Sequence, residues 1–158
     1  MLNLKVIGIC GGSWGDGGVG KTTAVNIMSK QMGFYPASFM DPVKDVAKKH
    51  FGWDGKMTPD SRVLLDQICR RGRMISENYW RDLSILRIPK EAEKIVFDDL
   101  WFDNEAQFVV GCGGFVVRIT KQGHLSPELR LEATDVPNDK TLRDFQRELM
   151  MAVSLKTV

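Results

Sequence analysis

The segment from Gly15 to Thr22 fits the phosphate-binding pattern G-x-x-x-x-G-K-[ST], between an apolar run at 4–9 and a segment with helical spacing. Glycines let the backbone curl so that consecutive amide groups point at a polyphosphate. Lys21 can then reach the β- and γ-phosphates, and the Thr22 hydroxyl can bind Mg²⁺. The pattern predicts nucleotide binding by the following residues: Gly15, Gly17, Gly18, Val19, Gly20, Lys21, Thr22 and Thr23.

A second candidate is an apolar run at 95–97 that ends in two acids, Asp98 and Asp99. Proteins with this kind of loop place an acid from a strand end beside the loop threonine, where it can hold Mg²⁺ directly or through water. Alternate residues of a strand face opposite ways, so only one of the two acids can face the metal. The bare pattern leaves the choice open, and it also fits a solvated turn.

Asp41 and Lys44 lie where a second predicted strand runs into a helix. Ligands bind at the carboxyl ends of parallel strands, so Asp41 could hold an acceptor hydroxyl or take its proton, and Lys44 could meet an anion. However, Asp41 followed by Pro42 is also an ordinary helix start that needs no function. Spacing alone favours neither interpretation.

Four arginines, Arg62, Arg70, Arg71 and Arg73, surround an apolar helical stripe in residues 62–73. The guanidinium group offers the donor geometry that best matches a phosphate. Basic helix ends are also common because of the helix dipole. We expect at least one of these arginines to bind phosphate.

The elements that must position these residues alternate between strand and helix, which predicts an α/β fold with a parallel five-stranded sheet and helices on both faces. Thr58 and Pro59 are a helix start, and Gly33, Gly52, Gly72 and the run 111–114 are stops. Strands are expected at 4–10, 35–39, 94–98, 115–120 and 133–136, helices at 21–32, 42–50, 60–71, 78–87, 103–110 and 140–153, and mobile loops at 53–58 and 121–132.

Composition restricts the class of protein. The length of 158 residues predicts a single domain. The composition, with 43% hydrophobic and 27% charged residues, is typical of a soluble globular protein. The net charge of +2 gives no argument for nucleic acid or a membrane as partner. Three cysteines without a C-x-x-C pair predict neither a zinc site nor a disulfide framework. With no apolar stretch near about 18 residues, the expected location is cytoplasmic.

Most of the chain resembles the phage-type deoxynucleoside monophosphate kinases, small adenylate-kinase-like enzymes with the P-loop NTPase fold. Five segments carry the resemblance in the family's order: 39–44 is similar to F-A-D-P-L-K, 62–73 to R-x-L-L-Q-x-x-G-x-x-x-R, 96–106 to V-I-x-D-V-R-F-x-N-E-A, 113–119 to G-G-x-V-I-x-I, and 137–142 to I-x-N-D-G-T-L.

The resemblance implies transfer of the γ-phosphate of ATP to a deoxynucleoside monophosphate, with an insertion at about 41–88 that binds the acceptor and a short lid at about 121–132. Thr22 and Asp99 would hold Mg²⁺, Asn138 would lie near the adenine, and the main catalytic residues would be Lys21, Asp41, Arg62 and Asp99. The attacking phosphate oxygen is already anionic, so no strong general base is required. Residues implied to bind the acceptor are Asp41, Lys44, Arg62, Gln67, Arg70, Arg73, Trp80 and Lys121.

The chain also differs from the family pattern. Trp101 replaces the arginine of D-V-R-F, which removes a charge that could touch the phosphates. Residues 11–14 intervene before the loop, Asp16 places a carboxylate inside it, and Lys121 stands where arginine is usual.

An alternative comes from residues 17–23, G-G-V-G-K-T-T, which also form the loop core of partitioning-type switch ATPases with a deviant Walker A motif. The signature lysine of those proteins precedes this core, and here that place is Asp16. We favour the kinase, because the arginines and the D-P-V-K segment would have no task in a switch. The sequence leaves open which base is accepted, whether ribonucleotides are accepted, and whether the chain forms a homodimer.

Overall fold

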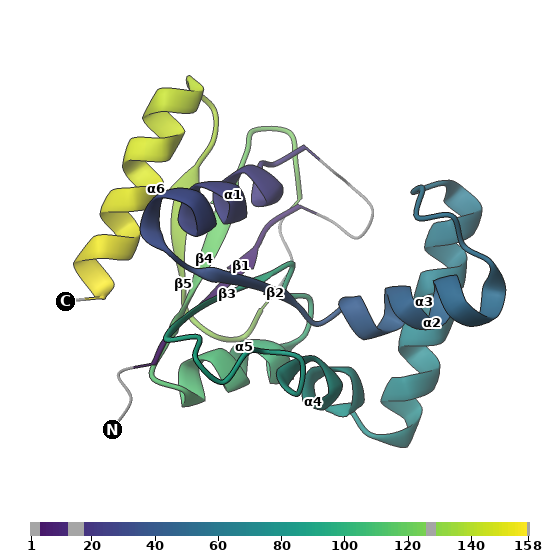
Figure 1. Ribbon diagram of the computed structural model, residues 1–158. Coiled ribbons are helices and arrows are strands. Elements are labelled where there is room, and N and C mark those ends of the chain that lie inside the picture. The colour runs from purple at the N-terminus through teal and green to yellow at the C-terminus, as the bar shows by residue number, and fades with distance from the viewer. Residues whose placement is uncertain (1–3, 13–17, 126–128, 158) are drawn as a thin grey trace. The chain divides into compact units, whose positions relative to one another are not determined.

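The computed structural model describes residues 4–12, 18–125 and 129–157. Along this part of the chain, strands and helices alternate as the sequence predicts (Figure 1). The elements are β1 (Lys5–Cys10), α1 (Lys21–Met32), β2 (Tyr35–Ser38), α2 (Asp41–Phe51), α3 (Pro59–Ile75), α4 (Tyr79–Ile85), β3 (Lys94–Asp98), α5 (Asp103–Gly111), β4 (Phe115–Thr120), β5 (Ala133–Pro137) and α6 (Leu142–Lys156).

The five strands form one sheet in the order β2-β3-β1-β4-β5, with β1 parallel to both β3 and β4. Helices α1 and α6 cover one face of this sheet, and α5 covers the other (Figure 1). The core between the sheet and helices α1 and α6 is built from side chains such as Ile7, Met28, Val96 and Phe145. The predicted parallel α/β fold with helices on both faces is therefore confirmed.

Most helix ends lie close to the predicted positions, because the terminal residues supply the expected caps. Thr58 accepts a hydrogen bond from the Ser61 amide at the start of α3, with Pro59 in the first turn. Gly33 and Gly52 end their helices in the left-handed conformation that glycine adopts without steric cost.

Gly72 was predicted to end a helix, and this is wrong. Helix α3 continues through Gly72 to Ile75, and the indole of Trp80 occupies the space that a Cβ atom at position 72 would need. Gly72 is thus a glycine because of close packing between α3 and α4.

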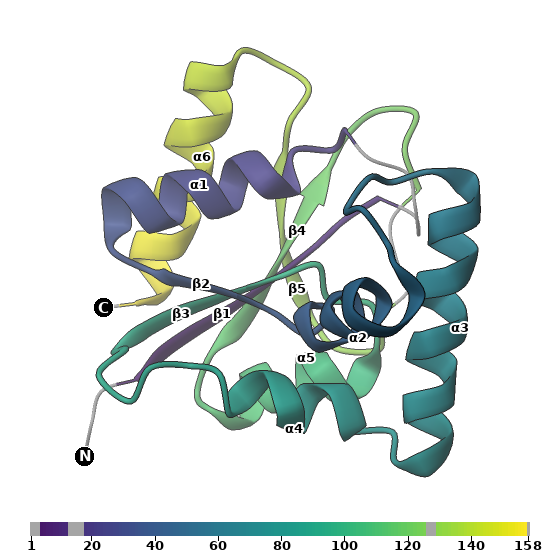
Figure 2. The same ribbon diagram turned by 45° about the vertical axis from the view of Figure 1, so that its right-hand side comes forward.

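The chain divides into two compact units, which we describe separately. The sheet unit comprises residues 1–37 and 90–158, and the helical unit comprises Ser38–Pro89, close to the insertion expected at about 41–88. In the helical unit, α2, α3 and α4 pack against one another (Figure 2). The loop at 53–58 is tied by hydrogen bonds, including one from the Trp53 indole to the Lys56 carbonyl.

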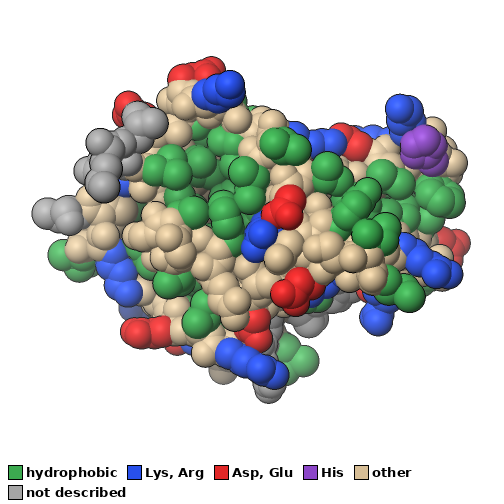
Figure 3. All heavy atoms as spheres, turned by 90° about the horizontal axis from the view of Figure 1, so that it is seen from below, with side chains coloured by type: hydrophobic (Ala, Val, Ile, Leu, Met, Phe, Trp, Pro, Cys, Tyr) green, Lys and Arg blue, Asp and Glu red, His purple; other side chains and the backbone are tan. Residues whose placement is uncertain are grey.

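Hydrophobic side chains also reach the surface, in groups separated by charged residues (Figure 3). In the helical unit, Met74 and Ile75 are each 76% exposed. None of the described helices combines the length and the apolar character needed to cross a membrane.

Candidate active site

The described part of the phosphate loop has the backbone that its glycines predict. Gly18 and Gly20 have φ angles of 102° and 105°, a region that L side chains rarely adopt. Gly20 directly precedes α1, whose first-turn amides have no partner within the helix. Val19 is buried in the core and anchors the loop, whereas Thr22 is exposed in the first helical turn. Gly15 and Gly17 lie outside the described residues.

The ammonium group of Lys21 has three partners among the described residues. Its Nζ atom donates to the Gly11 carbonyl at 2.7 Å and lies 2.6 Å from Oδ1 of Asp99. It also lies over the ring of Trp101, 4.7 Å from the ring centroid. The Lys21 side chain is 16% exposed and that of Asp99 is 36% exposed, so both groups can still be reached from solvent.

Asp99 reaches Lys21 because the chain turns sharply after β3. Among the described residues, Asp99 is the one non-glycine residue with a positive φ, at 58°. Aspartate tolerates this left-handed conformation better than most side chains do. The next residue, Leu100, donates its amide to the Ile9 carbonyl of β1 at 2.8 Å, which fixes the turn to the central strand.

Two further predicted residues meet the phosphate loop from neighbouring strand ends. Asn138 follows β5, and its side chain donates to the Val19 carbonyl at 2.8 Å. Lys121 follows β4, and its Nζ atom donates to the Gly18 carbonyl at 3.1 Å. The carboxyl ends of these parallel strands therefore bring Asn138 and Lys121 to the phosphate loop. The resemblance assigned Lys121 to the acceptor, and the structure places it against the loop.

The other predicted acceptor residues lie in the helical unit. Asp41 and Lys44 face each other across the first turn of α2, with 3.8 Å between Nζ and Oδ1. Arg62 is exposed in the first turn of α3. Arg73 donates to the Glu77 carbonyl at 2.9 Å. The roles of these residues remain predictions.

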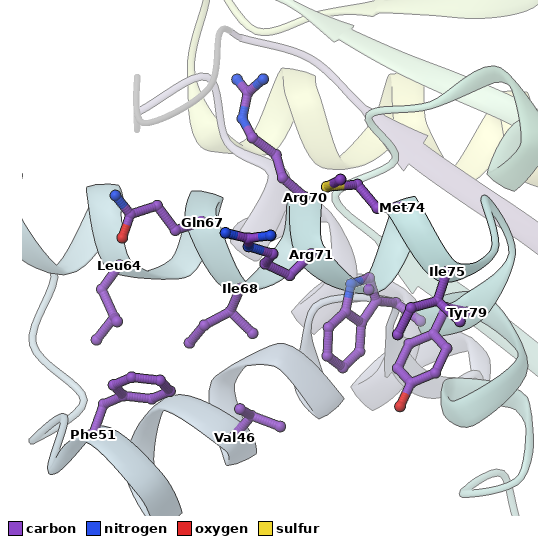
Figure 4. A pocket seen from close by; sticks show the side chains of 12 residues that line it. Val46, Phe51, Leu64, Gln67, Ile68, Arg70, Arg71, Met74, Ile75 and Tyr79 are labelled. Carbon is purple, nitrogen blue, oxygen red and sulfur yellow. The ribbon is translucent and has the colours of Figure 1, made fainter.

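A cavity of about 750 Å³ lies among the helices of this unit. Gln67, Arg70 and Trp80, all predicted to bind the acceptor, contribute to its lining. In Figure 4, Leu64 and Ile68 point from α3 toward Phe51 on α2, so the cavity has an apolar side, while Gln67 and Arg70 point the other way. Arg70 is held by Asp66, with 2.7 Å between Nε and Oδ2.

Trp80 also has a structural role. It is 7% exposed, and its indole Nε1 donates to the Cys69 carbonyl at 2.8 Å. Its ring meets that of Tyr79 edge to face, with centroids 4.9 Å apart. Trp80 can therefore offer a ligand a ring surface rather than its N–H group.

Sequence reasoning missed several residues that the structure places at these sites. Trp101 was interpreted only as a lost charge, although it lies two residues after Asp99 and contacts Lys21. Arg71 and Tyr79 line the cavity of the helical unit. Arg71 is one of the four arginines that the sequence indicated, although it was given no role of its own, whereas Tyr79 was missed because nothing in the local sequence distinguishes it.

Cys10, at the carboxyl end of β1, also lies near Lys21. Burial raises the pKa of its thiol to about 11, and the positive charges of Arg118 and Lys21 offset only part of that effect. The thiol is therefore neutral at physiological pH and adds no charge to the site.

Comparison with known proteins gives a full-length relative. No family model matches the sequence. A protein of Acanthamoeba polyphaga mimivirus named "Putative deoxynucleotide monophosphate kinase" is 27% identical to the chain, over 95% of this chain and 96% of that protein. Its name gives the enzyme class that the motifs resemble.

Solved structures show the same fold. A structure from Chloroflexus aurantiacus titled as that of a "putative kinase" matches with a TM-score of 0.52 and 13% identity, covering 96% of this chain and 94% of that one. A gluconokinase from Sinorhizobium meliloti matches with a TM-score of 0.50 and 12% identity, covering 96% and 92%. The chain thus shares the α/β fold of these two structures.

Proposed function

We propose that this chain is a kinase that transfers the γ-phosphate of ATP to a deoxynucleoside monophosphate and releases the diphosphate. The observation that carries phosphoryl transfer is Lys21 held 2.6 Å from Asp99, beside a loop in which Gly18 and Gly20 have φ angles that L side chains rarely adopt. The choice of acceptor is supported by the full-length relative, whose name specifies a deoxynucleotide monophosphate.

The residues on the donor side fit a nucleoside triphosphate. The positive φ angles of Gly18 and Gly20 and the start of α1 leave backbone amides to bind phosphate oxygens, as helix N-termini do for anions. Lys21 adds a positive charge where negative charge develops during transfer. We assign Thr22 and Asp99 to Mg²⁺, which would neutralise phosphate charge, because a hydroxyl and a carboxylate are the oxygen donors that this cation prefers.

On the acceptor side, we assign the monophosphate to the helical unit. A cavity of about 750 Å³ falls within the usual range for small-molecule pockets. Arg70 and Gln67 line it, and Arg62, Arg73, Asp41 and Lys44 supply further charges in the same unit. Phosphoryl transfer requires mainly positioning and charge neutralisation from the protein. These side chains would hold the acceptor while its own phosphate oxygen attacks.

The test is an assay of ADP release with the four deoxynucleoside monophosphates and their ribo counterparts, each with Mg²⁺ and with a chelator. We expect fast ADP formation only when a monophosphate and Mg²⁺ are both present. Slow turnover that is the same with every acceptor would contradict the proposal and favour a switch ATPase. The cytoplasmic location and a homodimer remain predictions.

A further inference from the structure

The backbone at Trp101 and at the residue before it is held by hydrogen bonds to two other elements. Its amide donates to Oε2 of Glu105 at 2.9 Å, and Glu105 is itself a buried residue of α5. The preceding residue, Leu100, is bonded to the Ile9 carbonyl of β1. The indole is therefore carried by a segment held between the central strand and a helix of the sheet unit.

The ring of this fixed residue faces the ammonium of Lys21. At 4.7 Å from the centroid, Nζ is within the range of about 6 Å for a cation–π interaction, and tryptophan is the best partner for it. A ring attracts a cation through its quadrupole and carries no net charge. It can therefore orient Lys21 without neutralising it, whereas Asp99 attracts the same ammonium at the cost of cancelling its charge.

We propose that Trp101 is a positioning residue for the phosphate donor, which holds the Lys21 ammonium in place beside the phosphate loop. Asp99 holds Lys21 only while its carboxylate is not engaged by another cation. The Trp101 ring holds Lys21 in either case, and it leaves the full positive charge of the ammonium available to the phosphates. This inference rests on the proposed function, because its ligand is the ATP of that reaction.

The experiment is a double-mutant cycle on ATP affinity, measured by calorimetry with the full chain. The variants are Trp101→Leu, Lys21→Met and the two combined. We expect Trp101→Leu to weaken ATP binding by roughly 2- to 30-fold when Lys21 is present, the range that a cation–π contact of about 0.5–2 kcal/mol allows. In the Lys21→Met background, the same change should have almost no effect.

Trp53→Leu is the matched control, because the Trp53 ring has a similar contact with Lys48, at 5.8 Å, in the helical unit. Trp53→Leu should leave ATP affinity unchanged. Trp101→Phe keeps an aromatic ring at position 101, so it should retain most of the ATP affinity that Trp101→Leu loses. Thermal unfolding checks the fold. If Trp101→Leu does not fold, Trp101→Met takes its place, since a flexible methionine fills irregular space well.

Unchanged ATP affinity in Trp101→Leu, or an equal loss with and without Lys21, would overturn the proposal and leave Trp101 as a packing residue. Failure of the unaltered protein to bind ATP would instead contradict the proposed function. The two failures are therefore distinguishable.

Discussion

Replacing Asp99 with asparagine keeps the shape of the side chain and removes its charge. In the structure, Oδ1 of Asp99 lies 2.6 Å from Nζ of Lys21, and both side chains are partly buried. Hydrogen bonds to charged groups contribute about 1.5–3 kcal/mol, which corresponds to a factor of roughly 10 to 150. A neutral amide is also a poorer partner for a hard cation such as Mg²⁺.

We therefore expect Asp99→Asn to lower kcat/KM by roughly 10- to 150-fold and to raise the Mg²⁺ concentration needed for the half-maximal rate. The assay is the initial rate of ADP formation over a range of ATP concentrations, repeated across a Mg²⁺ titration, with thermal unfolding as the check on the fold. Asp98→Asn is the matched control, because Asp98 is the last residue of β3 and immediately precedes Asp99. Its effect should be clearly smaller.

Two results would refute this reasoning. If Asp98→Asn raises the Mg²⁺ requirement more than Asp99→Asn does, the strand end presents the other acid to the metal. If Asp99→Asn leaves both the rate and the Mg²⁺ requirement unchanged, the contact with Lys21 is only a surface ion pair, many of which contribute little.

Lys21→Ala should lower the rate by about 10²–10³, because it removes a preorganised charge from the transition state, and a variant that melts normally but keeps most of its activity would contradict the phosphate-loop assignment. Arg62→Ala should raise KM for the monophosphate by about 10- to 100-fold and hardly change ATP affinity, as measured by initial rates, if Arg62 binds the acceptor phosphate. Equal losses for both substrates would point to another role. Gly72→Ala should lower the free energy of unfolding in urea by about 1–3 kcal/mol, because the Trp80 indole fills the space of the new methyl group. An unchanged urea midpoint would show that Trp80 can move aside without cost.

The fold could be predicted from local signals because the helices and strands begin and end at residues with intrinsic preferences. Thr58 caps a helix, and Gly33 and Gly52 end helices in the left-handed conformation. Gly72 shows the limit of this reasoning. Position 72 must be glycine because the indole of Trp80, from another helix, packs against it. A contact between two helices is not encoded in the residues that neighbour Gly72 in the sequence.

The candidate site likewise has a part that could be predicted from the sequence and a part that could not. The loop glycines and Lys21 are recognisable because they are close in sequence and their spacing matches the phosphate-binding pattern. The contact of Lys21 with the Gly11 carbonyl and with Trp101 depends on how strand ends meet, and on the left-handed turn at Asp99. No periodicity in the sequence predicts such a turn at a residue other than glycine. The roles of Arg62 and the other residues of the helical unit remain to be tested by mutation.

Trp101 shows why counting charges along a sequence misjudges this site. Taken as a replacement for arginine, it removes one cation from the reach of the phosphates. In the structure, its ring instead lies against the ammonium of Lys21, while Lys121 contacts the Gly18 carbonyl and brings a second cation to the loop. An arginine at position 101 would repel Lys21 and compete with it for Asp99. The electrostatics of the proposed donor site therefore depend on where each cation lies as well as on how many there are.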